Sequence, residues 1–462
     1  MSLEVSKIAE ELAERYAPEH VDYTGVAQAK SLLTKSIMPS DIFAFGGQGA
    51  EIQTSIGKVL DMSSMTVNAV LGQNDPWVTA NMIAFLKSGR PSFLSSRYGS
   101  EFYYLLAEKL AKVGKIPEAV VNHRQCNGSD VTELALLAAY QRRAGRTKLA
   151  SFEGSYHGQN LTSYLASDLQ KKHRFLSGDG DETDVLFLPA PDNQGIDGLA
   201  EVSDSDLRVF DMLEDRRKEI FAVILEPIQV NNGVRTPSKL FMQNLQTFCN
   251  TNDIALIFDE IQTGFGWLGE LSAAERYDVV PDMLAVSKGL TGGYGPMSAL
   301  VMRKSYENLP YGTAEKTNGS DLRALVAANS VWQRLCGMPE LDIPDCIDGE
   351  LRNQLKTGLI SQVTSRAEKL DLDLKEIMRD SNGLVSGISG DRMLKGLNIV
   401  DPKGRPNPDI AKQMYLDLLK RNVYVRCSGS TLIVKPPLVI TDSQLNEGLA
   451  VLMSTVKEFG DK

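Results

Sequence analysis

The sequence predicts an α/β protein whose core is a mainly parallel β-sheet flanked by helices. Two observations carry this prediction. Short apolar runs recur between residues 119 and 302, and stretches with helical periodicity separate them. Such runs are typical of strands buried on both faces, and helical crossovers between them favour parallel pairing. The flanking segments of the chain predict a smaller α+β domain.

Seven runs are the expected strands of the large sheet: 119–122, 148–152, 185–189, 222–226, 255–259, 284–287 and 298–302. Before them, an amphipathic helix is expected over 2–17, and turns and short strands are expected over 39–86. After residue 325, strands are expected at 394–400, 423–426 and 432–434. A last helix should begin after Thr441, which stands at capping-box spacing from Gln444.

We therefore expect an N-terminal segment of the small domain over 1–60, a large domain over 61–325 and the rest of the small domain over 326–462.

Composition excludes several classes of function. The net charge of -10 over 462 residues disfavours nucleic-acid and membrane partners. Scattered Cys and only four His residues give no metal-ligand spacing, so no metal is expected. No targeting or membrane-spanning segment is recognised, and a cytoplasmic protein with small-molecule partners is expected.

Polar residues that directly follow the expected strands are the candidate site, because ligands of such sheets gather at the carboxyl ends of the strands. Glu226, Asp259 and Lys288 stand there. A buried carboxylate such as Asp259 needs a cation or hydrogen-bond donors, so a structural salt bridge is an equally good explanation. Desolvation would depress the pKa of Lys288 towards a neutral amine that attacks carbonyls. A surface lysine at a turn is the alternative.

Two glycine-containing segments suggest phosphate binding. Residues 127–130 (NGSD) precede a helical stretch, where free N–H groups and the helix dipole favour an anion, although an ordinary helix cap has the same pattern. Residues 264–269 (GFGWLG) have the spacing of a dinucleotide-binding fingerprint. Trp267 within that loop is too large for the close packing that the fingerprint needs, so an NAD-dependent dehydrogenase is disfavoured.

Four runs, in chain order, are SYHG, LEPIQ, IFDEIQTGFG and AVSKGLTGG. Together they resemble the class III (ornithine/ω-amino acid) aminotransferases of pyridoxal-phosphate (PLP) fold type I, over roughly residues 45–440. The resemblance implies PLP as cofactor. It also implies that Lys288 holds PLP as a Schiff base and that Asp259 pairs with the pyridine nitrogen.

The resemblance assigns further cofactor contacts position by position. Gly128 and Ser129 match the phosphate loop, with the backbone of Asp130 beside them. Tyr156 matches the aromatic residue stacked on the ring, and His157 follows it. Glu226 and Gln262 match polar residues that flank the ring. Thr317 matches a threonine that reaches the phosphate of a neighbouring subunit, which implies a homodimer.

The implied reaction moves an amino group from an amine or amino acid to a small keto acid through pyridoxamine phosphate. Lys288 would serve as the proton carrier and Asp259 as the group that keeps the ring protonated. Similar cofactor residues also occur in amino-acid racemases, epimerases and aminomutases of the family, so isomerisation is the alternative reaction. A non-catalytic binding protein on the same fold is a second alternative, which the retained Lys288 and Asp259 disfavour.

The sequence departs from part of the family at the expected substrate carboxylate site. Members that use 2-oxoglutarate carry a Glu and an Arg where this chain has Asn231 and Ile433. Arg426 matches instead the carboxylate-binding arginine of the amine:pyruvate branch, and Lys435 is a further candidate. A guanidinium can donate two parallel hydrogen bonds to a carboxylate. We therefore expect a small keto acid such as pyruvate to be preferred over 2-oxoglutarate.

Overall fold

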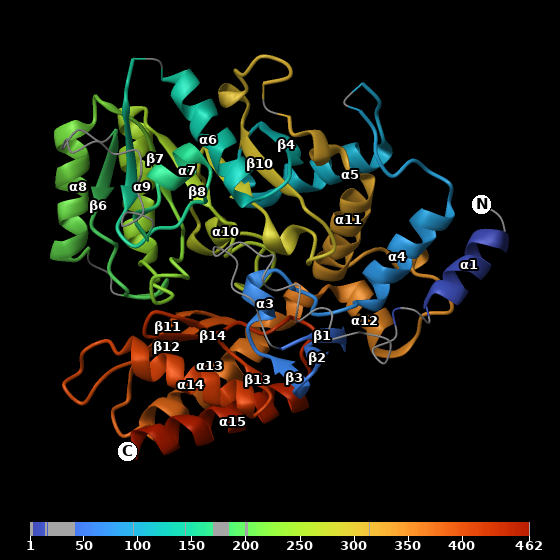
Figure 1. The fold of residues 1–462 in the computed structure, drawn as a ribbon. Coiled ribbons are helices and arrows are strands. Elements are labelled where there is room, and N and C mark those ends of the chain that lie inside the picture. Colours follow the sequence, from blue (N-terminus) through green and yellow to red (C-terminus); the bar gives the residue numbers. More distant parts are fainter. Residues whose placement is uncertain are drawn as a thin grey trace, which may run out of the picture.

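The computed structural model describes residues 3–13, 16, 42–95, 97–143, 145–169, 184–198, 202–313 and 315–461. Within these residues the chain forms a larger domain around a seven-stranded sheet and a smaller domain with two four-stranded sheets (Figure 1). In Figure 1 the smaller domain lies below the larger one, and the C-terminus lies in its lower part. None of the helices in the described ranges is long and apolar enough to cross a membrane.

The large sheet has the strand order β4-β10-β9-β8-β7-β5-β6. Its strands are β4 (Ala119–Gln125), β5 (Lys148–Phe152), β6 (Val185–Leu188), β7 (Ile220–Leu225), β8 (Ala255–Asp259), β9 (Met283–Val286) and β10 (Ser298–Arg303). All seven expected strands are present. The strands from β6 to β9 pair in parallel, and β10 runs antiparallel to both of its neighbours. The sheet is therefore mainly parallel, as predicted, with one reversed strand.

Helices cover both faces of this sheet because its central strands are buried on both sides. On one face, Val223 and Phe258 pack in a cluster with Leu245 of α9 and Leu213 of α8. On the other face, Ile224 and Ile257 cluster with Leu134 of α6. The helices of this domain are α4 (Pro76–Lys87), α5 (Glu101–Leu110), α6 (Gly128–Arg142), α7 (Leu161–Leu165), α8 (Asp204–Arg216), α9 (Lys239–Asn252), α10 (Ala273–Tyr277) and α11 (Leu322–Cys336).

The smaller domain combines segments from both parts of the chain. One sheet has the order β1-β2-β3-β13 and the other β11-β12-β15-β14. The strands are β1 (Ala44–Gln48), β2 (Glu51–Thr54), β3 (Gly57–Asp61), β11 (Val385–Asp391), β12 (Leu394–Ile399), β13 (Val423–Tyr424), β14 (Arg426–Ser428) and β15 (Thr431–Val434). The parallel pairing of β3 with β13 joins the N-terminal strands to the C-terminal segment.

The remaining helices are α1 (Leu3–Ala13), α3 (Ser64–Val67), α12 (Gly349–Thr357), α13 (Val363–Arg379), α14 (Pro408–Lys420) and α15 (Asp442–Gly460). The predicted capping box of the last helix is present, with Thr441 and Gln444 bonded reciprocally. Part of the predicted helix over 2–17 lies outside the described residues, and Ile8 on its apolar face is exposed. The short α3 is unusual because all four of its residues have positive φ.

Two local expectations were wrong. Residues 76–87, expected as turns and strands, form α4, since Asp75 caps the N–H groups of Trp77 and Val78 and Pro76 occupies the first turn. The single strand expected at 423–426 is divided between β13 and β14, which belong to different sheets. The chain thus changes sheets directly before Arg426.

Candidate active site

A cavity of about 280 Å³ lies at the carboxyl ends of β7, β8 and β9. It collects eight of the predicted site residues from five separate chain segments. These are Gly128, Ser129, Tyr156, His157, Glu226, Asp259, Gln262 and Lys288. Parallel strands bring their carboxyl ends to one edge of a sheet, which explains why residues so distant in sequence meet here.

Lys288 stands directly after β9 and Ser287, in the turn Lys288–Leu290. Its φ of +32° lies in the left-handed region, which a non-glycine residue adopts only at an energetic cost that the surrounding structure must offset. Burial and the charge of the Arg426 guanidinium together lower the pKa of the Lys288 amine to about 8, although the charges of Asp259 and Glu226 oppose the shift. The protonated amine therefore still predominates near physiological pH, but the neutral fraction is far larger than for an ordinary lysine.

Asp259 is the last residue of β8 and is buried. Its Oδ2 lies 2.8 Å from His157 Nδ1, and its Oδ1 accepts a hydrogen bond from the N–H of Ile261 at 3.2 Å. Nε2 of His157 is buried and has no hydrogen-bond partner among the described residues. Within the same residues, no arginine or lysine forms an ion pair with Asp259. The structure therefore offers a buried carboxylate at the cavity that no arginine or lysine among the described residues pairs with directly.

The start of α6 forms the opposite end of the cavity. Asn127 caps the helix by accepting the N–H of Asp130 at 3.0 Å, whereas the N–H groups of Gly128 and Ser129 have no partner among the described residues. A side chain at position 158 would come within 2.6 Å of Ser129 Oγ, so glycine there keeps this end open. A helix start with free donors and open space suits a phosphate. Asp130 does not line this cavity, and its N–H is occupied by the cap.

Glu226 and Tyr156 form one wall. The backbone N–H of Tyr156 donates to Glu226 Oε2 at 2.9 Å. Burial, together with the nearby Asp259 carboxylate, holds the pKa of Glu226 well above its ordinary value. Burial thus favours the protonated form of Glu226, although the charges of Lys288 and Arg426 oppose this shift.

Arg426 approaches the cavity from the smaller domain. Its Nη1 donates to Gln262 Oε1 at 3.2 Å and its Nη2 to Asn231 Oδ1 at 2.6 Å. Both acceptors are neutral amides. The Arg426 backbone N–H donates to Ser63 Oγ at 2.8 Å, which fixes β14 against the segment after β3. Arg426 is also the direct cross-strand partner of Ile433, so the two side chains share one face of the sheet.

These residues fit PLP. The cavity presents an amine for the aldehyde, a carboxylate for the pyridine nitrogen and a helix start for the phosphate. Its buried Asp259 has no cationic side chain as a partner among the described residues, and a pyridinium would supply one.

A family model described as "Aminotransferase class-III" matches residues 39–456. The chain belongs to this family. Its members depend on PLP, which is the cofactor of this class III aminotransferase. Acetylornithine aminotransferase of Agrobacterium fabrum is 28% identical over 352 residues, covering 74% of this chain and 76% of that protein. Alanine/serine racemase of Pyrococcus horikoshii is 27% identical, covering 78% and 74% respectively.

Solved structures share the fold of this class III aminotransferase. A taurine:2-oxoglutarate aminotransferase from Bifidobacterium kashiwanohense, in complex with PLP and glutamate, has a TM-score of 0.80 at 22% identity, covering 96% of this chain and 99% of that one. Ornithine aminotransferase from Toxoplasma gondii has a TM-score of 0.77 at 18% identity, covering 100% and 99%. PLP fold type I, predicted from the motifs, is confirmed.

Lys435 of this aminotransferase takes a position that sequence reasoning missed. Its side chain is fully buried, and its Nζ donates to the backbone carbonyl of Gln262. The same amine lies 3.6 Å from the centroid of the Trp267 ring. Burial, together with the charges of Lys288 and Arg426, holds the pKa of Lys435 well below its ordinary value. Lys435 therefore supports the loop behind the cavity and does not face a substrate carboxylate.

Thr317 stands apart from the cavity in the single chain. It begins the turn Thr317–Ser320, which contacts β4, and its side chain is exposed. Nζ of its neighbour Lys316 lies 3.6 Å from Oδ1 of Asp130 in α6.

Trp267, the residue that disfavoured a dinucleotide site, is fully buried, and its Nε1 donates to the Pro436 carbonyl at 3.0 Å.

Proposed function

We propose that this class III aminotransferase transfers its amino group to a small keto acid such as pyruvate, and that Arg426 binds the acceptor carboxylate. One observation supports the proposal most directly. Arg426 reaches Gln262 in the wall of the cavity, and its two side-chain hydrogen bonds go to neutral amide oxygens. A carboxylate in their place would form charge-assisted, bidentate hydrogen bonds, which are about twice as strong.

The same surroundings disfavour 2-oxoglutarate. Its second carboxylate needs a second cation, but the two positions where 2-oxoglutarate-using relatives are expected to carry a Glu–Arg pair hold Asn231 and Ile433. Lys435 cannot replace that arginine, because its amine is buried behind Gln262. A second carboxylate would therefore lose its hydration without gaining an ionic partner.

The roles that we propose for the cavity residues follow from their contacts. PLP, when bound, withdraws electrons from the substrate carbon that carries the amino group. Asp259 holds a proton at the pyridine nitrogen, and His157 orients Asp259 through the contact between their side chains. Lys288 anchors the cofactor and then carries the proton removed from the substrate carbon. The N–H groups of Gly128 and Ser129 bind the phosphate, and Tyr156 covers the ring.

We propose further that the active unit is a homodimer in which Thr317 of each chain approaches the phosphate site of the other. The exposed side chain of Thr317 is compatible with such a contact. Cofactor affinity should then fall on dilution to monomer. The cytoplasmic location expected from the sequence stays a prediction.

The acceptor proposal is tested by loading the enzyme with pyridoxamine phosphate and following the return of the aldehyde cofactor by absorbance. Pyruvate should restore it faster than 2-oxoglutarate. Arg426→Ala should reduce kcat/KM for pyruvate by about 10- to 100-fold, the equivalent of about 1.5–3 kcal/mol for a hydrogen bond to a charged group.

Arg421→Ala is the matched control, since Arg421 lies on the surface of the same domain and pairs with Glu458. It should leave both keto acids unaffected. Faster recovery with 2-oxoglutarate, or indifference to the Arg426 change, would show that the acceptor carboxylate is held elsewhere.

Isomerisation is a second candidate, because the alanine/serine racemase of Pyrococcus horikoshii matches this chain about as well as the aminotransferases do. The two reactions differ in their products. An aminotransferase converts an amine without a keto acid only once per active site, whereas a racemase inverts it catalytically. Chiral chromatography of an amino acid incubated with enzyme alone distinguishes them.

A further inference from the structure

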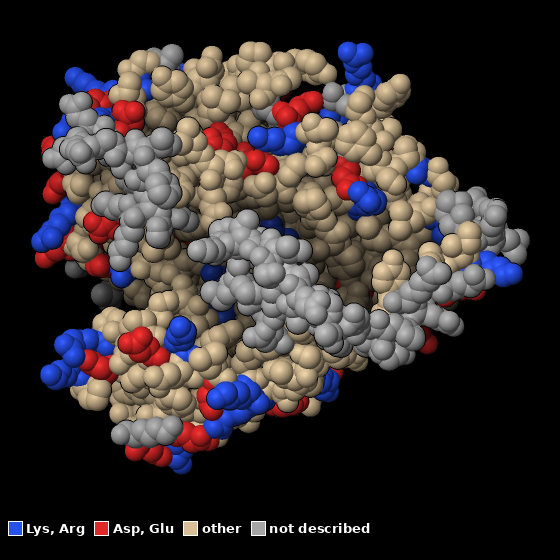
Figure 2. Space-filling model, in the orientation of Figure 1, with Lys and Arg blue, Asp and Glu red and all other residues tan. Residues whose placement is uncertain are grey.

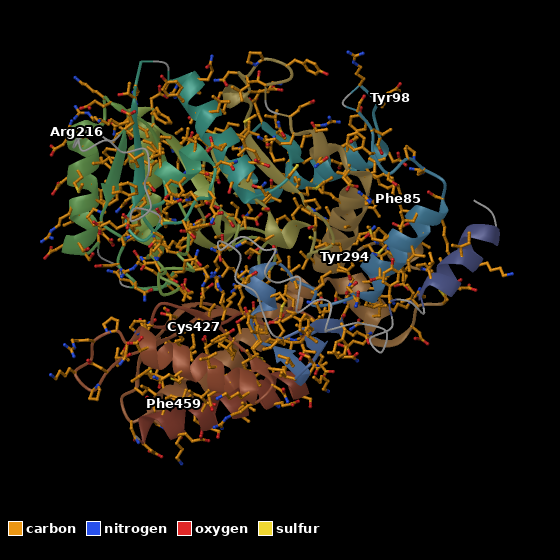
Figure 3. The ribbon with its side chains drawn as sticks, in the orientation of Figure 1. Phe85, Tyr98, Arg216, Tyr294, Cys427 and Phe459 are labelled. Atoms are coloured by element: carbon orange, nitrogen blue, oxygen red, sulfur yellow. The ribbon has the colours of Figure 1, made fainter. Side chains whose placement is uncertain are left out.

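A second cavity, of about 410 Å³, lies beyond Arg426 between the smaller sheet and the loop 231–235 of the larger domain. Its lining is polar but almost uncharged. Four asparagines, three serines and one threonine contribute, and Arg235 is the single charged residue among the described lining residues. Figure 2 shows the molecular surface hollowed between the two domains. Cys427, labelled in Figure 3, lies on the edge of the smaller domain that faces this hollow.

The strand register explains why this cavity adjoins the catalytic one. Arg426, Ile433 and Gly396 are direct partners across β14, β15 and β12. Two residues further along, Ser428, Thr431 and Asn398 form the next row on the same face. The Thr431 hydroxyl donates to Asn398 Oδ1 at 3.0 Å, which confirms that these side chains point the same way. The sheet thus places a row of neutral polar groups directly beside Arg426.

The Arg426 guanidinium bonds to one lining residue of each cavity. One of its hydrogen-bond partners, Gln262, lines the catalytic cavity, and the other, Asn231, lines the polar cavity. Displacement of this side chain would connect the two spaces. A substrate longer than a small amine would then extend from Lys288 past Arg426 into the polar cavity.

We propose that the polar cavity binds the distal end of the amino donor, and that this end carries uncharged amide or hydroxyl groups. The inference rests on the proposed function, since it places the reacting amine at Lys288. The cavity wall offers both donors and acceptors that have no partner among the described residues. They are the amide nitrogen of Asn398, the side-chain oxygen of Asn232 and the hydroxyl of Ser430.

Charged distal ends fit this cavity less well. A distal ammonium would meet Arg235 and Arg426 and would find no Asp or Glu among the described lining residues. A distal carboxylate would depend on Arg235, whose Nη1 already donates to the Pro191 carbonyl at 2.9 Å and whose Nε is buried, without a partner among the described residues, where a ligand in the cavity does not reach it. Neutral amides and hydroxyls need no counter-charge and can use the free groups of the wall.

The test compares primary amines of equal length whose far end is an acetamide, a hydroxyl, an ammonium, a carboxylate or a methyl group. The holoenzyme should show at least a tenfold higher kcat/KM for the acetamide and hydroxyl donors than for the other three. Asn398→Leu should lower kcat/KM about fivefold to tenfold for these two donors, the usual loss for one hydrogen bond, and leave the methyl donor unchanged.

Ser430→Ala provides a milder variant of the same wall, because the Ser430 hydroxyl holds no structural hydrogen bond among the described residues. Asn353→Leu, at an exposed position of α12, is the control for the same substitution outside the cavity. If Asn398→Leu does not fold, Ser430→Ala still decides the question. Equal rates for all five donors, or a preference for the carboxylate donor, would overturn the proposal.

A binding measurement separates this inference from the proposed function. An N-alkyl acetamide of the same length, which has no amine to react, should bind the holoenzyme in calorimetry and bind more weakly to Ser430→Ala. If no donor is turned over but the acetamide binds in this way, the proposed function fails and the cavity assignment stands. If donors react while the acetamide does not bind, the cavity assignment fails alone.

Discussion

His157 Nδ1 lies 2.8 Å from Asp259 Oδ2, and both side chains are buried. An ionised carboxylate can only accept hydrogen bonds, so Nδ1 of His157 carries the proton in this pair. The imidazole therefore fixes the orientation of the carboxylate at the cavity. Glu226 lines the same cavity, and burial together with the charge of Asp259 raises its pKa well above the ordinary value. Two acidic residues that line one cavity thus have different surroundings.

Matched amide substitutions should distinguish the contributions of Asp259 and Glu226 to the reaction rate. Asp259→Asn removes the charge that retains a proton on the cofactor ring, and we expect the half-reaction with an amine to slow by about 10²–10³-fold. Glu226→Gln replaces an acid whose protonated form burial favours by a neutral amide of the same shape that still accepts the Tyr156 N–H, so its effect should stay within a few-fold. Stopped-flow absorbance measures both rates. Similar losses in the two variants would contradict the assignment of charge to Asp259.

Lys288→Ala should abolish the covalent link to the cofactor and reduce turnover by about 10²–10⁴-fold or more, because anchor and proton carrier are the same amine. Borohydride reduction of the wild-type holoenzyme, followed by peptide mapping, should label Lys288. A label on Lys435 or on any other lysine would refute the assignment.

The pH dependence of cofactor capture follows from the pKa of Lys288. Only the neutral amine attacks an aldehyde, and the pKa of about 8 means that the neutral fraction of the cofactor-free protein rises through pH 8. The rate of PLP capture should therefore increase with pH around this value and level off above it. Arg426→Leu removes a positive charge that lowers the pKa of Lys288, so its profile should move to higher pH. A midpoint near the ordinary lysine value in the wild type would contradict the burial of Lys288.

Lys435→Met should stabilise the cofactor-free protein at neutral pH. The folded-state pKa of Lys435 is depressed, so the unfolded chain binds more protons and the wild-type stability rises with pH towards the ordinary lysine value. Methionine removes this dependence and fills similar volume against Trp267. The melting temperature should increase at pH 7, and the difference from wild type should shrink at higher pH.

Lys395→Met is the control for Lys435→Met. Lys395 is also buried, but its Nζ lies 2.5 Å from Asp371 Oδ1, so methionine there leaves a carboxylate without its partner. Its melting temperature should fall. If both substitutions lower the melting temperature, the contacts of the Lys435 amine with Gln262 and Trp267 stabilise the fold by more than the burial of this amine costs.

The strands, and the polar residues at their carboxyl ends, were predictable from the sequence because apolar runs and the residues that follow them are local signals. The parallel pairing of the strands also predicted that Lys288, Asp259 and Glu226 lie close together. The His157–Asp259 contact was not predictable, since it joins a loop residue to the end of a strand 102 positions away. The burial of Lys435 was missed for a similar reason. Charge predicts exposure, and only the tertiary structure shows that Trp267 and Gln262 enclose this amine.

The register that pairs Arg426 with Ile433 also limits what a sequence alignment can detect. Directly opposed positions of two antiparallel strands deliver their side chains to nearly the same volume, although the alignment assigns them to different columns. When one enzyme has its arginine at one of these positions and another has it at the cross-strand partner, an alignment therefore records the loss of one recognition residue and the unrelated gain of another. Enzymes of this family are therefore better compared by the position of each guanidinium group in the structure than by aligned sequence position alone.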